Sequence, residues 1–133
     1  MELFQKILCP VDHDGQCHAS LDLARKIAEL TRARVYTLHV AFTEPDEVRG
    51  TEKGVTLRLK KIVEEHLHGL DYEFMVRVGS PAAEILDAAR ELGADLIVIP
   101  THGRAGLPRL VLGSVAERVI RESNIPVLAV RKS

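Results

Sequence analysis

Residues 100–117, PTHGRAGLPRLVLGSVAE, place three glycines and a serine between a run of aliphatic residues and a predicted helix. Gly113 and Ser114 stand where that helix is expected to begin. The start of a helix exposes unpaired backbone N–H groups and carries a partial positive charge, and a glycine there lets an anion approach the backbone. The pattern therefore predicts a loop that binds phosphate.

Two further features of the loop bear on this prediction. The thirteen residues that end at Gly113 make a long connection, and long ordered loops tend to be functional. Arg104 and Arg109 could neutralise phosphate charge, although they could equally be solvated surface residues. Ser114 and Glu117 also match a capping box, so an ordinary capped helix explains the serine as well. The loop is neither a Walker motif nor a GxGxxG fingerprint.

A second group of chemically capable side chains lies in the segment CPVDHDGQCH. Its residues of metal-ligand type are Cys9, Asp12, His13, Asp14, Cys17 and His18. Zinc motifs have closer cysteine pairs and a second ligand pair at a defined distance, and neither feature occurs here. We therefore expect Cys9 to pack in a sheet, and we predict no metal bound by protein ligands.

Composition limits the class of protein. The 133 residues suit one domain over residues 1–133, with 46% apolar residues and 18 basic against 19 acidic residues. This balance argues against a disordered chain and against a surface for nucleic acid. The N-terminus has no secretory pattern and no segment approaches a membrane span, so we expect a cytoplasmic protein.

Apolar patterning predicts five strands and four helices. The strands are expected over residues 5–11, 34–40, 72–78, 95–99 and 126–131, and the helices over 19–30, 59–67, 81–92 and 114–123. Ser80 and Pro81 should open the third helix, whereas Gly69 and Gly93 should end the second and third. Residues 41–54, rich in charge and containing a proline and two glycines, are expected to form a long surface loop.

Strands that alternate with helices predict an α/β fold with a doubly wound parallel sheet covered on both faces. Ligands bind such sheets outside the carboxyl ends of the strands, where the strand order reverses. The informative residues are therefore Asp12, Val40 and the stretch 100–114.

Three stretches, KILCPVD, TLHV and GADLIVIPTHGRAGLPRLVLGSVAERVIRESNIPVLAVR, resemble the universal stress protein family over essentially the whole chain. The resemblance implies a Rossmann-like fold with strand order 3-2-1-4-5. Nucleotide-binding members carry glycine, two residues, glycine, nine residues, then glycine with serine or threonine. Gly103, Gly113 and Ser114 match this motif, but Pro100 replaces its first glycine, which removes a backbone donor beside the nucleotide.

By the same resemblance the chain would bind ATP or a related adenine nucleotide. The implied site residues are Pro10, Val11, Asp12, Val40, Ile99, Pro100, His102, Gly103, Arg104, Gly113, Ser114 and Val115. Asp12 would hold the adenine and ribose end, and the Val40 backbone would contact adenine. Amides of the glycine-rich loop would hold the phosphates, and Mg²⁺ would be bound mainly through the phosphates. The alternative role for Asp12 is structural, because an aspartate after a strand often caps the next turn.

The resemblance also implies a stress-response sensor or regulatory module that forms a homodimer. The dimer would pair the final strands through Val127, Leu128, Ala129 and Val130. Two alternatives stay open. Because of Pro100, the chain could be a family member that binds no nucleotide and acts through protein contacts. It could also be a slow ATPase, in which Asp12 or His102 would act as the general base. Nucleophilic catalysis is not indicated, because no nucleophile with an adjacent base is evident in the sequence.

Overall fold

The computed structural model describes residues 3–12, 17–41, 46–101 and 113–131, and for residues 46–53 only the backbone. These residues form five strands and four helices in alternation. The elements are β1 (Lys6–Pro10), α1 (His18–Thr31), β2 (Arg34–Ala41), α2 (Asp46–Leu67), β3 (Tyr72–Val78), α3 (Pro81–Leu92), β4 (Leu96–Pro100), α4 (Ser114–Glu122) and β5 (Val127–Val130). Every predicted strand is present, with ends that differ by at most one residue.

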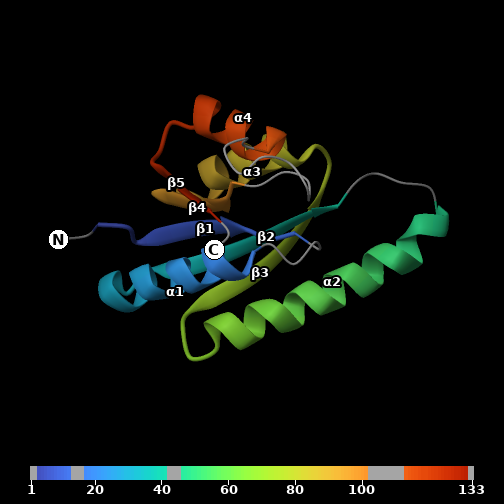
Figure 1. Cartoon of the computed structure of the whole chain (residues 1–133), viewed down its shortest axis with the longest axis horizontal. Coiled ribbons are helices and arrows are strands. Elements are labelled where there is room, and N and C mark those ends of the chain that lie inside the picture. Colours follow the sequence, from blue (N-terminus) through green and yellow to red (C-terminus); the bar gives the residue numbers. More distant parts are fainter. Residues whose placement is uncertain (1–2, 13–16, 42–45, 102–112, 132–133) are drawn as a thin grey trace.

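The sheet is parallel throughout, with the order β3-β2-β1-β4-β5, as predicted. In Figure 1 α1 and α2 lie on one side of the sheet, and α3 and α4 lie on the other. The order reverses at β1, which pairs with β2 on one side and with β4 on the other. Because all strands are parallel, their carboxyl ends lie together at one end of the sheet, which we call the carboxyl edge. There the chain that leaves β1 continues to α1 on one face, and the chain that leaves β4 continues to α4 on the other face.

Alternating side chains of the central strands point to opposite faces of the sheet and pack into two separate hydrophobic cores. From β1, Ile7 and Cys9 pack with α1 and α2, whereas Leu8 packs with α3 and α4. From β4, Val98 joins the first core and Ile97 the second. All five side chains are fully buried. This continuous burial on both faces explains why β1 and β4 are apolar runs rather than alternating ones.

The prediction of a loop over residues 41–54 is wrong for most of its length, because α2 begins at Asp46 and extends for 22 residues. The charged residues of this stretch are good helix formers, and its glycines cost only about 1 kcal/mol each relative to alanine. Val55, Leu59, Val63 and Leu67, each four residues apart, are buried and hold the helix against the sheet. That packing outweighs the glycines.

Two helix ends follow the sequence signals, and the start of α4 does not. Gly69 and Gly93 adopt φ values of 88° and 69°, the left-handed conformation expected after a helix. The predicted capping box at α4 is wrong: Gly113 is the N-cap, Ser114 is already helical, and the Glu117 carboxylate bonds Arg121 instead. Since glycine tolerates the N-cap position well, the helix can begin one residue early.

Candidate functional site

The candidate site begins at the carboxyl end of β1. Pro10 ends this central strand and is buried, and the next amide, Val11 N–H, donates to the carbonyl of Leu38 in β2 at 2.9 Å. Val11 is only 5% exposed, whereas Asp12 is exposed. The strand is therefore followed by a buried apolar residue and then by an exposed aspartate.

The end of β4 lies next to β1 at the same edge. Ile97 and Thr101 donate their N–H groups to carbonyls of Pro126 and Val130, on the β5 side, both at 3.0 Å. Because successive residues of a strand face alternate neighbours, the nitrogen of Pro100 faces β1 instead. The proline thus costs no hydrogen bond to β5, and the N–H that it lacks would have pointed toward β1.

The first turn of α4 follows. Gly113 is buried, and its N–H donates to the Thr101 carbonyl at 2.7 Å, which ties the helix start to the end of β4. The first helical bond runs from the Glu117 N–H to the Gly113 carbonyl. The amides of residues 114 to 116 therefore have no acceptor within the helix, as at any helix start. Ser114 is exposed and Val115 is half-buried.

The end of β2 lies next to β1 on the side opposite β4. Val40 is half-buried, and the neighbouring Ala41 accepts a hydrogen bond from the Gly79 N–H at 2.9 Å, which links the ends of β2 and β3. Ile99, the other predicted wall residue, is 3% exposed and belongs to the core under α3 and α4.

The structure thus brings nine of the twelve predicted site residues to one edge of the sheet. They are Pro10, Val11, Asp12, Val40, Ile99, Pro100, Gly113, Ser114 and Val115. His102, Gly103 and Arg104 lie outside the described residues, as does Arg109. The arrangement joins an exposed carboxylate, apolar walls and a helix N-terminus, a combination suited to a ligand with an apolar ring and an anionic group.

The cysteines contribute no nucleophile to this edge. Cys9 and Cys17 are both fully buried, which confirms the expectation that Cys9 packs in the sheet. Burial raises the pKa of the Cys9 thiol to about 12, and the nearby Cys17 acts in the same direction. A thiol that stays protonated at neutral pH is a poor nucleophile and a poor metal ligand.

A separate hollow of about 390 Å³ lies between the last turns of α3 and α4, at the amino edge of the sheet. Its wall includes Asp87, Arg90, Arg118 and Glu122. The first two are paired with each other, and Arg118 Nε lies 2.9 Å from Glu122 Oε2. Since these charges already neutralise one another, the hollow offers little for a charged ligand, and we place the candidate site at the opposite edge.

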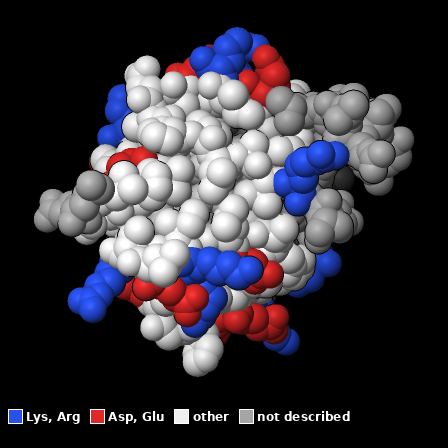
Figure 2. Space-filling view, turned by 60° about the vertical axis from the view of Figure 1, so that its left-hand side comes forward, with Lys and Arg blue, Asp and Glu red and all other residues white. Residues whose placement is uncertain are grey.

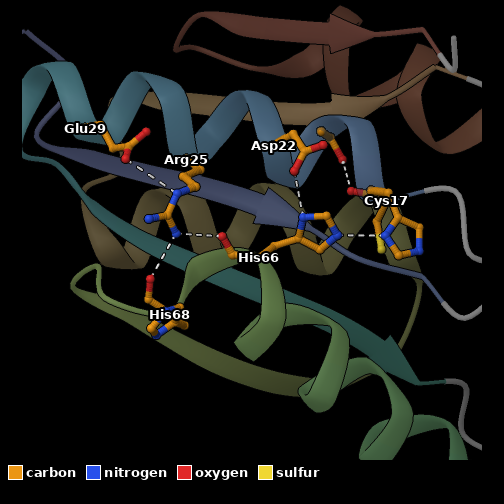
Figure 3. A network of polar contacts seen from close by, with 8 residues as sticks. Cys17, Asp22, Arg25, Glu29, His66 and His68 are labelled. Carbon is orange, nitrogen blue, oxygen red and sulfur yellow. Dashed lines mark hydrogen bonds and ion pairs between the residues drawn. The ribbon is translucent and has the colours of Figure 1, made fainter.

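One cluster was not predicted from the sequence. His18 Nδ1, at the start of α1, lies 2.7 Å from His66 Nε2 in the last turn of α2, and His66 Nδ1 lies 2.7 Å from Asp22 Oδ1 (Figure 3). The sequence separates the two histidines by 48 positions. Only the packing of α1 against α2 brings them together, and no local sequence pattern shows which two helices pack side by side.

The charge distribution agrees with the balanced composition. On the face drawn in Figure 2, acidic and basic side chains lie next to one another at the top and at the bottom of the view, and most of the surface between these two groups carries neither. Within the part of the chain that the structure describes, no helix is both long enough and apolar enough to cross a membrane. Over the same residues, no three side chains of histidine, cysteine, aspartate or glutamate are grouped to hold a metal ion.

Comparison with known proteins agrees with this architecture. The model of the universal stress protein family matches residues 3–131. Universal stress protein MJ0531 of Methanocaldococcus jannaschii is 35% identical, over 98% of this chain and 84% of its own length. A universal stress protein of Archaeoglobus fulgidus, solved in complex with dAMP, superimposes with a TM-score of 0.72 at 27% identity, over 96% of this chain and 98% of that one.

A further universal stress protein, solved in complex with cAMP, has a TM-score of 0.77 over 98% of this chain and 99% of its own; at 24% identity it supports the fold alone. The five-stranded Rossmann-like sheet, the helix that starts with Gly113 and Ser114, and a family match that spans nearly every residue lead to one conclusion. The chain belongs to the universal stress protein family.

Proposed function

We propose that the chain binds ATP or a related adenine nucleotide at the carboxyl edge of its sheet, between β1 and β4. The observation that carries this proposal is the reversal of strand order at β1, where Asp12 follows β1 and α4 begins after the neighbouring strand β4. Doubly wound sheets bind nucleotides at such a point.

Each part of the nucleotide has a counterpart in this arrangement. The Asp12 carboxylate can accept hydrogen bonds from ribose hydroxyls, and the half-buried Val40 offers backbone groups to adenine. The amides of Ser114 and Val115 and the Ser114 hydroxyl are available to phosphate oxygens at the start of α4. The Gly113 amide donates to the Thr101 carbonyl and so does not bind phosphate itself; its bond holds the start of α4 beside the end of β4. Mg²⁺ would be held mainly by the phosphates.

The Archaeoglobus fulgidus relative that binds dAMP supports an adenine ligand. The second candidate, a member that binds no nucleotide and acts through protein contacts, is favoured by one observation: the nitrogen of Pro100 faces β1 without a hydrogen to donate. In either case we place the protein in the cytoplasm as a homodimer that acts as a sensor or regulatory module, with at most slow hydrolysis of ATP.

The test is native mass spectrometry of freshly purified protein, followed by calorimetric titration with ATP and Mg²⁺. We expect co-purified nucleotide or saturable binding. Gly113→Val should abolish binding, because a branched side chain would stand where the phosphate approaches. Gly113 has φ −65° and ψ 152°, a conformation open to any residue, so backbone strain adds nothing and the circular dichroism spectrum should stay that of a folded protein.

A matched pair of serines supplies the control. Ser80 and Ser114 both stand exposed at a helix start on the carboxyl edge, Ser80 before α3 and Ser114 in α4. Ser114→Ala should weaken ATP binding severalfold through the lost hydroxyl, whereas Ser80→Ala should leave it unchanged. A chain that neither carries nor titrates nucleotide would transfer the function to protein contacts.

A further inference from the structure

The cluster between α1 and α2 lies apart from the carboxyl-edge site, and its geometry points to a second ligand. We infer that His18 and His66 bind a divalent transition-metal ion of the zinc class between their facing ring nitrogens, with Asp22 as a positioning residue. This inference does not depend on the proposed nucleotide site.

Two imidazole nitrogens face each other across the helix interface. His18 Nδ1 and His66 Nε2 are 2.7 Å apart, and the ring centroids are 4.9 Å apart with the planes tilted by 54°. The rings therefore meet edge to edge, not face to face. Imidazole nitrogen is a preferred ligand of zinc, copper and nickel, whereas magnesium and calcium prefer oxygen. The chemistry thus selects a transition metal.

The tautomers of the two rings are compatible with coordination. An ionised Asp22 carboxylate only accepts hydrogen bonds, so in the neutral form of His66 the hydrogen is on Nδ1 and the lone pair of Nε2 faces His18. His18 then donates from Nδ1 in the metal-free state. When a metal ion enters, the His18 hydrogen moves to its Nε2, and both facing nitrogens offer lone pairs without net loss of a proton.

His66 is held in place before any metal arrives. Asp22 fixes one side of its ring in the carboxylate–histidine arrangement that orients many metal ligands. Its backbone carbonyl accepts a hydrogen bond from Arg25 Nη1 at 2.9 Å, and the same nitrogen bonds the His68 carbonyl at 3.0 Å (Figure 3). The ring is largely covered, with 18% of its side chain exposed.

His18 supplies the movement that coordination requires. Two zinc–nitrogen bonds of about 2.0 Å at a tetrahedral angle separate the nitrogens by roughly 3.3 Å, so they must part by about half an ångström. His18 is exposed at the first position of α1, where its side chain can swing without disturbing the core. Water would complete the coordination, because the described residues group no third ligand there. The site would accordingly be weaker than a four-ligand structural zinc site.

The experiment is calorimetric titration of the untagged protein with ZnCl₂ in a buffer without phosphate or nucleotide, since both chelate metals. We expect saturable binding of one zinc ion per chain. His18→Gln and His66→Gln should each weaken it at least tenfold, and Asp22→Asn should weaken it roughly tenfold through the lost orientation of His66. MgCl₂ should give no binding at this cluster.

His68→Gln is the matched control, because it removes an exposed histidine two residues from His66 while the backbone bond to Arg25 stays. This variant should bind zinc as the parent protein does. Unchanged affinity in His18→Gln and His66→Gln, an equal loss in His68→Gln, or no zinc binding by the parent chain would each overturn the inference. Since His18 is exposed, His18→Gln tests it even if His66→Gln disturbs the helix interface.

Discussion

Pro100 ends β4 with its ring nitrogen directed toward β1, at the position where the resemblance described above places the first glycine of the nucleotide-binding motif. Pro100→Gly would restore a backbone N–H on the side facing β1 and remove the proline ring from the end of β4. We expect the variant to bind ATP severalfold more tightly, measured by calorimetric titration. Weaker binding would mean that the proline ring is part of the adenine site.

Pro126→Gly controls for this experiment. Pro126 precedes β5 on the far side of β4, and its carbonyl accepts the Ile97 N–H. The substitution adds similar freedom to the unfolded chain. It should lower stability without changing nucleotide affinity, and a parallel gain in affinity would show that flexibility, rather than the site, explains the effect of Pro100→Gly.

Cys9 makes stability depend on alkaline pH. The pKa of its thiol is raised from 9.0 to about 12, chiefly by burial. Between these values the unfolded chain releases a proton that the folded chain keeps, so the free energy of unfolding falls as pH rises above about 9. Urea unfolding at pH 8 and pH 10.5 should show this loss. It should be smaller in Cys9→Ala, and equal slopes for the two proteins would contradict the assignment.

At the scale of elements, Arg25 joins the end of α2 to α1. Its guanidinium donates to the carbonyls of His66 and His68, two acceptors that the end of a helix otherwise leaves unpaired. Arg25→Met keeps the aliphatic stem but removes both bonds. We expect a loss of about 1–3 kcal/mol in the free energy of unfolding, measured in urea.

Arg118→Met is the control for that prediction. Arg118 pairs with Glu122 one turn along the exposed face of α4, and such surface pairs contribute only about 0.3–0.5 kcal/mol. Equal losses in the two variants would show that Arg25 acts as one surface charge among others rather than as the link between α1 and the end of α2.

The elements show what the sequence could predict. Apolar runs such as ILCP and LIVI predicted the central strands because both of their faces are buried, and Gly93 predicted the end of α3 because few other residues accept its left-handed φ. The start of α2 was missed, since local turn signals outweighed a helical face whose burial depends on the sheet. The capping box failed for a similar reason: Gly113 and Ser114 are both acceptable N-caps, and the bond to Thr101 decides between them.

The candidate site was likewise predictable from the sequence only in part. The topology fixes that Asp12, Val40 and the start of α4 reach one edge, so a motif and the alternation of elements suffice to predict it. The sequence could not show that the Gly113 amide is already bonded, or that His66 meets His18. Both facts arise from contacts between distant segments, and neither histidine has a partner at a spacing that any motif contains.

At the scale of the whole molecule, β5 ends the sheet with an apolar strand, and such an edge is a candidate for pairing with another chain. Leu128 is 37% exposed, and the four residues of β5 carry no charge that would discourage strand pairing. The carbonyls of Pro126 and Val130 face β4, so by alternation the backbone of Val127 and Ala129 faces outward. Those outward groups are the donors and acceptors that antiparallel pairing with a second copy would use.

Ala129→Pro tests this arrangement directly, because it removes an outward N–H and leaves the bonds to β4 in place; proline is also tolerated on edge strands. We expect the parent chain to be a dimer by light scattering over a dilution series, and Ala129→Pro to be a folded monomer. Ala129→Ser, which keeps the N–H, should remain dimeric.

A dimer that survives Ala129→Pro would have its interface elsewhere, and a parent chain that is monomeric throughout would remove the dimer from the proposed function. Loss of nucleotide affinity in the monomer would in turn indicate that the pairing of the two sheets supports the site at β4, the strand that lies between the dimer edge and the crevice.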